Sequence, residues 1–523
     1  MASSKGGGVT LRIKPVPVVI TVIVLALAVG MYAFYGPQFW RWLWTEGRPG
    51  LPVVVGVLGG VLLAGISGFV LYDRSGSRSY YDKAKPGEDR VPKLFVWIGL
   101  LAAVIGIVLW FVLPYQVNRA YLGSVDKTTS VPDFEERAPF DVANQVAKRN
   151  LEDITGNAQN TKSLADVGEN GSWNTLVVRR GIGSGYEASQ ELNVPLYGEV
   201  PKSSIDLCSF STDATLRLDG VLPGNNLNRA ILNATGPSTY FTDTDAYSYC
   251  DGKTPMVVAP LKAMKGGFTP HWVPAGAAVY NGKTGVLSIV RDTADLPGPV
   301  YPASLAEQQR TAYNAGGSYA DYLFGRFGYE PTDKDDDDPN KSNATEFSLI
   351  RQGSSTVDYV TPLTPVGSSG TVVGLSTVKA NTATYGTLNK VTLNRYPSGE
   401  TRQATSAVVA ALKSQYSSLT DWASGMKVFE VVPGRDNTWV ASLGQSQSVK
   451  YRAVIDDKGE VKLYDTAGRL IGNSDNGSSG GDSDSGSDTP TADSDLDKLT
   501  PQQLRDLGRA VLDELERRTE DGK

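Results

Sequence analysis

Hydrophobic positions are distributed very unevenly along the chain. Three long apolar runs, at residues 17–34, 51–72 and 94–113, contain no charged residue, whereas the sequence after Pro114 is mostly polar. Each run has about 20 residues, which is the length that an α-helix needs to cross about 30 Å of hydrocarbon. The pattern therefore predicts a bundle of three transmembrane helices within residues 17–114, followed by a large region outside the bilayer.

The positive charges around these runs predict how the chain is oriented. Lys and Arg are frequent before the first run and between the second and third, but sparse between the first and second. Because cytoplasmic loops carry an excess of Lys and Arg, residues 1–16 and the second loop are expected in the cytoplasm. We therefore expect a multi-pass protein of the cell membrane, with an extracytoplasmic region from residue 115 onward.

Small residues recur every fourth position along the second run, at Gly56, Gly60, Ala64 and Gly68. Such a ladder allows two helix backbones to approach closely in a membrane. The ladder predicts a helix-packing face, which serves either the three-helix bundle of one chain or a homo-oligomer.

Residues 115–400 show a β-rich pattern after a predicted helix at 141–155. Short apolar runs, including one at Ala214–Leu218, are separated by Gly, Pro, Asn and Asp, which favour strands joined by hairpin turns. The order strand, strand, tight turn, strand occurs three times, beginning at Met256, Tyr359 and Trp439. Duplication and convergence explain the recurrence equally well. The expected fold class is α+β to mainly β, built from antiparallel meanders.

An amphipathic helix precedes the last of these meanders. Within Ala404–Trp422, apolar residues recur at helical spacing, namely Val408, Leu412, Tyr416 and Leu419. A helix packed on four antiparallel strands is an α+β layer, and in this arrangement residues 401–470 resemble cystatin-type and NTF2-like extracytoplasmic modules. The resemblance implies a fold and no particular function, because such modules carry many functions.

The C-terminal tail changes composition twice. Residues 471–498 consist mainly of Ser, Gly and Asp, which cannot bury a core and predict a disordered linker. Residues 499–523 then regain an apolar stripe, with Leu504, Leu507, Val511 and Leu515 at helical spacing. This stripe predicts an amphipathic helix that docks on a neighbouring subunit or partner.

Two cysteines, Cys208 and Cys250, are the only ones in the chain. Because both lie in the region expected outside the cytoplasm, they are predicted to form a structural disulfide. The net charge of −6 lacks the basic excess of a nucleic-acid-binding protein, so no nucleic-acid partner is expected.

Catalytic chemistry has weak sequence support. The chain has one histidine, His271, so a Ser-His-Asp site or a His-rich metal site would depend on that residue, and we predict no catalytic, cofactor or metal site. The three short motifs of penicillin-recognising enzymes do occur in order, at Ser124–Lys127, Ser172–Asn174 and Lys283–Gly285.

Two functions therefore remain from the sequence. The leading hypothesis is a non-enzymatic, membrane-anchored envelope protein whose outer region binds protein or cell-wall partners. Such a protein would belong to an envelope-spanning transfer or secretion assembly, or to a phage or mobile element. The alternative is a cell-wall-active serine enzyme of the penicillin-recognising type.

Overall fold

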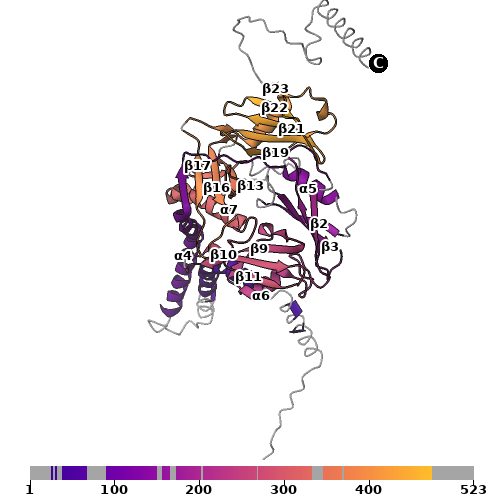
Figure 1. Ribbon diagram of the computed structural model, residues 1–523. Coiled ribbons are helices and arrows are strands. Elements are labelled where there is room, and N and C mark those ends of the chain that lie inside the picture. Colours follow the sequence, from indigo (N-terminus) through magenta and orange to yellow (C-terminus); the bar gives the residue numbers. More distant parts are fainter. Residues whose placement is uncertain are drawn as a thin grey trace, which may run out of the picture. The chain divides into compact units, whose positions relative to one another are not determined.

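The computed structural model describes residues 25–26, 30–31, 38–66, 90–149, 156–164, 172–201, 204–267, 269–332, 346–367, 370–397 and 399–473 (Figure 1). Met1–Ser474 form one compact unit. The predicted docking helix at 499–523 lies outside the described residues, as does the linker from 474 onward. Residues 471–473 were expected in that linker, but they belong to the last strand, β23 (Leu470–Asn473), because its backbone pairs with β22 (Val461–Asp465).

The N-terminal part of the described chain is helical. Residues 38–66 form helical segments that include η1 (Leu43–Gly47), α2 (Arg48–Val54) and η2 (Val55–Gly59), and α4 (Arg90–Tyr121) follows. Among the described residues, one helix, Leu94–Ser124, is long and apolar enough to cross a membrane, and Pro52–Ile66 is a shorter apolar helix. Since most of residues 17–34 lie outside the described part, the structure does not show the predicted three-helix bundle.

The small-residue ladder of the second run packs against α4 of the same chain. A Cβ atom added to Gly60 would lie 2.5 Å from the carbonyl oxygen of Gly99, and one added to Gly56 would lie 2.9 Å from the Cα of Gly106. Ala64 meets Gly99 in the same way. These positions therefore bring the two helix backbones into direct contact, while Gly68 lies outside the described residues.

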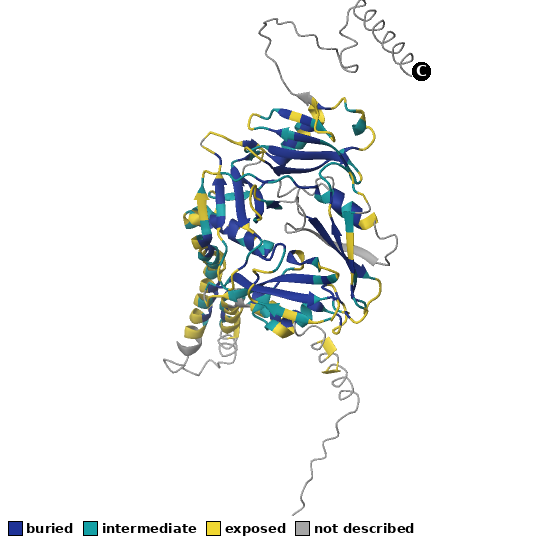
Figure 2. Cartoon of the chain, in the orientation of Figure 1, coloured by how far each residue is buried: buried dark blue, intermediate teal, exposed yellow. Residues whose placement is uncertain are grey.

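The helix α4 does not end where its apolar run ends. It passes through Pro114 and continues to Tyr121, and η3 (Leu122–Ser124) then leads directly into β1 (Val125–Thr128). β1 pairs in parallel with β17 (Val391–Arg395). In Figure 2 exposed residues run along α4 below the sheets, whereas most residues of the sheets are buried. The helix is thus built into the β-rich region without a flexible connection.

Four of the sheets form most of the β-rich region. The remaining strands of the sheet that contains β1 and β17 are β12 (Tyr329–Pro331), β13 (Phe347–Ile350), β14 (Val357–Pro365) and β16 (Gly374–Lys379). A second sheet contains β7 (Thr239–Tyr240), β8 (Tyr247–Asp251), β9 (Thr254–Lys265), β10 (His271–Asn281) and β11 (Leu287–Val290). A third contains β2 (Gly156–Leu164), β3 (Ser172–Arg179), β4 (Tyr186–Leu192) and β6 (Ile205–Ser209). The fourth contains β5 (Gly198–Glu199), β19 (Lys427–Pro433), β20 (Trp439–Gln445), β21 (Ser448–Ile455), β22 and β23, and a short pair joins β15 (Thr371–Val372) to β18 (Arg402–Gln403).

The predicted antiparallel meanders are confirmed. The strands β9, β10 and β11 are consecutive antiparallel neighbours, as are β14, β16 and β17 and, in the last case, β20, β21 and β22. Helices lie between or beside the sheets: α5 (Phe140–Arg149), α6 (Leu227–Thr235), α7 (Ala303–Ala312), α8 (Tyr319–Leu323) and α9 (Thr405–Gln415).

One predicted strand, Ala214–Leu218, was wrong. It forms only an isolated bridge at Arg217. The backbone N–H of Leu218 donates to the hydroxyl of Tyr186 at 2.9 Å, and that of Leu216 donates to the hydroxyl of Tyr280 at 3.3 Å. Two buried tyrosines therefore satisfy the donors that a neighbouring strand would otherwise take.

The C-terminal sheet packs against α9 as the sequence predicted, but the helix ends at Gln415 and not at Trp422. Val408 and Leu412 belong to a core cluster that includes Trp439 and Leu443. Beside this core the Asp421 carboxylate accepts hydrogen bonds from the side chains of Lys450 and Tyr451. These two bonds lower the pKa of Asp421.

Residues 133–137, here called the strap, tie this sheet to the others. Arg137 donates to the carbonyl of Ser348 in β13 at 2.9 Å and pairs with Glu430 in β19, and its guanidinium lies 5.1 Å from the ring of Trp173 in β3. Glu136 pairs with Arg452 in β21. One short segment thus connects three sheets through buried ionic and aromatic contacts.

Candidate functional site

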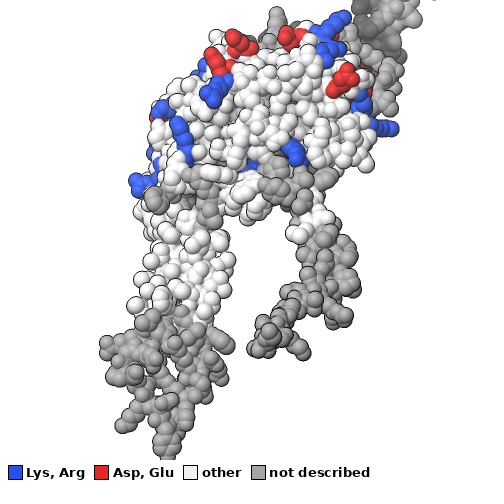
Figure 3. Space-filling model, turned by 90° about the horizontal axis from the view of Figure 1, so that it is seen from below, with Lys and Arg blue, Asp and Glu red and all other residues white. Residues whose placement is uncertain are grey.

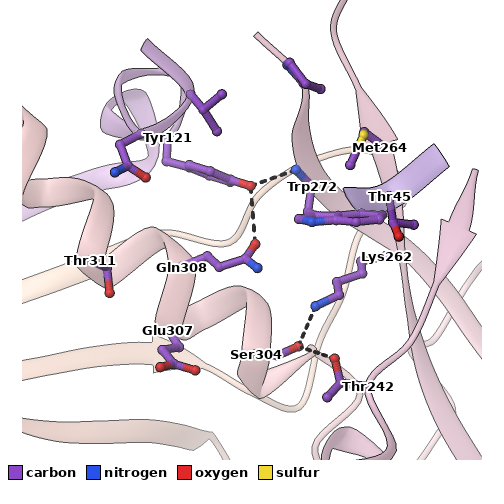
Figure 4. Close-up of a pocket in the computed structure, with 13 residues that line it drawn as sticks. Thr45, Tyr121, Thr242, Lys262, Met264, Trp272, Ser304, Glu307, Gln308 and Thr311 are labelled. Carbon is purple, nitrogen blue, oxygen red and sulfur yellow. Dashed lines mark hydrogen bonds between the residues drawn. The ribbon is translucent and has the colours of Figure 1, made fainter. Parts of the chain in front are cut away.

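A cavity of about 560 Å³ lies where α4 meets the β-rich region (Figure 4). Its walls come from η1, α4, β9, β10, α7 and the loops before β8 and β10. The lining residues are Thr45, Val117, Asn118, Tyr121, Thr242, Lys262, Met264, Pro270, Trp272, Ser304, Glu307, Gln308 and Thr311. Most of the polar groups that line the cavity are uncharged, one is the buried cation Lys262, and one is the exposed carboxylate Glu307.

The helix α7 supplies one wall because its two faces differ. Ser304, Glu307, Gln308 and Thr311 follow the three- and four-residue spacing of one helix face and line the cavity. On the opposite face Leu305 and Gln309 are fully buried. The Gln309 amide donates to the hydroxyl of Ser124 at 2.7 Å and to the carbonyl of Asn389 at 2.8 Å, which fixes α7 against the end of α4.

Lys262 places a positive charge in the cavity wall. It lies in the middle of β9 and is only 3% exposed. Its ammonium donates to the hydroxyl of Ser304 at 2.9 Å and lies 5.3 Å from the ring centre of Tyr240 and 5.6 Å from that of Trp272. A buried ammonium is costly unless hydrogen bonds and aromatic faces replace its hydration, and these contacts supply both.

Behind Ser304 lies a buried carboxylate, Asp245. The Ser304 hydroxyl donates to one oxygen of Asp245 and the Ser304 backbone N–H donates to the other at 3.0 Å. The Ser304 hydroxyl therefore donates to the Asp245 carboxylate and accepts from the Lys262 ammonium, so it links the two buried charges and holds Lys262 in place.

Tyr121 organises the upper part of the cavity. Its hydroxyl accepts the backbone N–H of Trp272 at 2.7 Å and donates to the side-chain carbonyl of Gln308 at 3.4 Å. Figure 4 shows that this leaves the amide nitrogen of Gln308 facing the space toward Lys262. Around Lys262 the cavity therefore combines one ammonium with a directed uncharged donor, which suits an oxyanion, while the Glu307 carboxylate lies elsewhere in the lining.

The predicted disulfide is present in the structure. Cys208 in β6 and Cys250 in β8 are bonded, with their Cα atoms 6.1 Å apart and a sequence separation of 42. The bond connects the sheet of β4 to the sheet of β9. Its role is structural, and neither cysteine lines the cavity.

The three serine-enzyme motifs lie on separate elements. Ser124 ends η3, where its hydroxyl donates to the carbonyl of Tyr121 at 2.7 Å. Ser172 lies in β3, and Lys283 lies in the turn between β10 and β11. The ammonium of Lys127 lies 4.8 Å from the ring centre of Tyr313. Among the hydrogen bonds of the described residues none joins one motif to another, so the structure gives this alternative no assembled site.

His271, the one histidine, begins β10 beside the cavity. Its Nδ1 lies 3.2 Å from the carbonyl oxygen of Thr269, and its ring packs edge-on against Tyr121 at 5.7 Å. Within the described ranges no group of three His, Cys, Asp or Glu side chains is placed to hold a metal ion.

The cavity was not predicted from the sequence. One signal was available: Lys262 interrupts the apolar run of β9, and a charge inside a buried strand is uncommon. Its partners Ser304 and Asp245 and the Tyr121 wall are far apart in sequence, and no spacing rule relates them. Searches with this chain match no protein-family model, no curated protein and no solved structure.

Proposed function

We propose that the protein is a membrane-anchored scaffold of the cell envelope. Its apolar N-terminal helices lie in the cell membrane, and its β-rich region stands outside the cytoplasm and binds protein or cell-wall partners. It has no catalytic role in this proposal. The observation that carries it is the unbroken path from the apolar part of α4 through Tyr121 into β1.

The exposure of α4 supports the membrane placement. Large apolar side chains face outward along its length, including Trp97 at 71% exposed and Trp110 at 63% exposed. In water such a surface would be unfavourable, and contiguous apolar surface of this extent is typical of contact with lipid or another protein. The absence of charged residues between 94 and 113 fits the lipid environment better.

The rigidity of the connection supports a scaffold. Beyond the apolar run, Tyr115 donates to the carbonyl of Gly317 at 3.1 Å, and Asn118 donates to the hydroxyl of Tyr322 at 3.0 Å. Ser124 and Gln309 then fix the end of the helix to α7. A tether between membrane and domain would allow free rotation, whereas these contacts hold the outer region at one height and angle.

A linker insertion tests the proposal. A short Gly/Ser segment between Leu113 and Pro114 breaks the helix but leaves the docked residues in place, and the same insertion between Gly353 and Ser354, in the turn before β14, is the matched control. Both variants and the wild type are crosslinked in cells and purified in detergent. We expect a defined set of envelope partners with the wild type and the control, and a reduced or altered set with the helix insertion.

Two results would contradict the scaffold. The first is partner recovery that the helix insertion leaves unchanged. The second is labelling of the protein by a fluorescent penicillin that is lost on Ser124→Ala, which would establish the serine-enzyme alternative. Membrane orientation is checked separately: an impermeant thiol reagent should fail to label Ser3→Cys in intact cells.

A further inference from the structure

The cavity at the base of the β-rich region has the chemistry and the height of a lipid-headgroup site. We propose that it binds an aminophospholipid of the outer leaflet, with the phosphate beside Lys262 and the amine beside Glu307. This inference rests on the membrane placement of the proposed function. It adds a ligand that neither the scaffold role nor the fold requires.

The height follows from helix geometry. The apolar run of α4 ends at Leu113, and the cavity-lining residues Val117, Asn118 and Tyr121 follow it by four to eight positions. At 1.5 Å per residue the cavity lies about 6–12 Å beyond the hydrocarbon edge. The headgroup layer extends about 5–8 Å beyond that edge on each side, so the lower part of the cavity lies at headgroup level.

A second element indicates the same level independently. α8 packs beside α4, with the ring of Tyr322 5.2 Å from that of Tyr115. At its end Leu323 and Phe324 are exposed, Phe324 at 64%, and the guanidinium of Arg326 lies 5.0 Å from the Phe324 ring centre. Exposed aromatic and aliphatic side chains with a neighbouring cation are typical of a membrane interface. Figure 3 views the molecule from below and shows Lys and Arg side chains, with some Asp and Glu, around the edge of the β-rich region.

The donor set matches a phosphate. Lys262 contributes the positive charge, Gln308 an amide N–H directed into the cavity, and Thr311 a hydroxyl, whereas the Thr242 hydroxyl donates to Ser304 at 3.2 Å. Charge-assisted hydrogen bonds to a phosphate are about twice as strong as neutral ones. The low exposure of Lys262 keeps water from competing for this charge, which strengthens the interaction further.

The acidic residue at the edge of the cavity selects the rest of the headgroup. Glu307 is exposed and lies one helical turn from Ser304 on α7. Its carboxylate would repel an anionic headgroup such as phosphatidylglycerol but attract the ammonium of phosphatidylethanolamine. Met264, Val117 and Pro270 form the apolar part of the lining, where the glycerol backbone and the start of the acyl chains would lie before they follow α4 into the bilayer.

The test uses the full chain in nanodiscs of phosphatidylcholine, alone or mixed with phosphatidylethanolamine or phosphatidylglycerol. After transfer to mild detergent, native mass spectrometry counts retained lipids and identifies their headgroups. We expect one phosphatidylethanolamine per chain. Thr311→Trp fills the cavity from an exposed helix position without altering the core, and should reduce retention at least tenfold. Ser414→Trp on α9 is the matched control and should retain lipid like the wild type.

Charge variants separate the two ends of the headgroup. Lys262→Met should abolish retention, whereas Lys265→Met, on the same strand but outside the cavity lining, should not. Glu307→Gln should remove the preference for phosphatidylethanolamine over phosphatidylglycerol. Equal retention of lipid by the wild type and by Thr311→Trp would overturn the proposal. Displacement of the bound lipid by soluble glycerophosphoethanolamine or inorganic phosphate, at concentrations near those of the lipid, would also overturn it. A chain that fails to enter nanodiscs would instead refute the membrane placement itself.

Discussion

The strap residue Arg137 offers a sharp test of what holds the sheets together. It is 9% exposed and its partner Glu430 is 4% exposed, so both charges lie within the protein. Arg137→Met removes the guanidinium but keeps a side chain of similar length beside Trp173. Glu430 is then left as a buried carboxylate without its main counter-charge.

The magnitude follows from this burial. Removing one partner of a buried ion pair costs about 3–5 kcal/mol, because the remaining charge loses its compensation. Loss of the hydrogen bond to the Ser348 carbonyl adds about 1 kcal/mol. The double variant Arg137→Met with Glu430→Met removes both charges, and apolar replacements of a buried pair are often neutral. We therefore expect the double variant to be more stable than Arg137→Met alone.

The assay is thermal unfolding of the detergent-solubilised chain, followed by near-ultraviolet circular dichroism. Arg137→Met should lower the midpoint by about 5–10 °C. The matched control is Arg435→Met, whose pair with Glu135 is 53% and 30% exposed at the two side chains, and solvent screens such exposed pairs so that they contribute little to stability. The reasoning is refuted if Arg137→Met costs no more than Arg435→Met, or if the double variant is less stable than both single variants.

Three further outcomes are expected. Replacing Cys208 and Cys250 by Ala should lower the free energy of unfolding by about 4 kcal/mol, since the bond closes a long loop, and an unchanged denaturation midpoint in non-reducing buffer would contradict this. Gly60→Leu should separate the two N-terminal helices and lower the midpoint for thermal aggregation in detergent, whereas Gly65→Leu, which has open space beside it, should have no effect. Asp421→Asn should destabilise the protein at about pH 7. The difference from the wild type should vanish as the pH falls below the ordinary value of 3.8, because a carboxyl group with a lowered pKa stabilises only while it is ionised; a constant difference in unfolding midpoint across this range would contradict it.

The meanders could be predicted because their signals are local. Asn281-Gly282 and the turn at Asp456–Gly459 lie between β-rich runs, and each turn brings adjacent strands together without information from elsewhere in the chain. In contrast, β2 (Gly156–Leu164) was not predicted. Its sequence is almost entirely polar, so it has no hydrophobic alternation, and pairing with β3 determines its conformation.

Longer-range contacts explain the remaining errors. The segment Ala214–Leu218 has a strand-like composition, but Tyr186 and Tyr280 hydroxyls satisfy its backbone from other elements. In the sequence, the strap has the composition of an ordinary charged loop. Its importance comes from the pairing of Arg137 with Glu430, across 293 positions. No local pattern indicates that such residues will meet.

No sequence pattern predicts the cavity, although ordinary physical interactions explain why its residues come together. An apolar residue at position 262 would suit the buried strand β9 better than Lys262, because a buried charge must be compensated. The structure compensates it with Ser304, Asp245 and the rings of Tyr240 and Trp272, which come from three separate parts of the chain. Those groups stabilise a charge that the β-sheet itself does not need, and the charge lies in the wall of a cavity beside α4. A buried cation in a cleft is a reason to expect a ligand there. Because Lys262→Met also removes a compensating charge from beside the buried Asp245 carboxylate, Thr311→Trp, which removes no charge, is the variant that separates loss of the ligand from loss of stability.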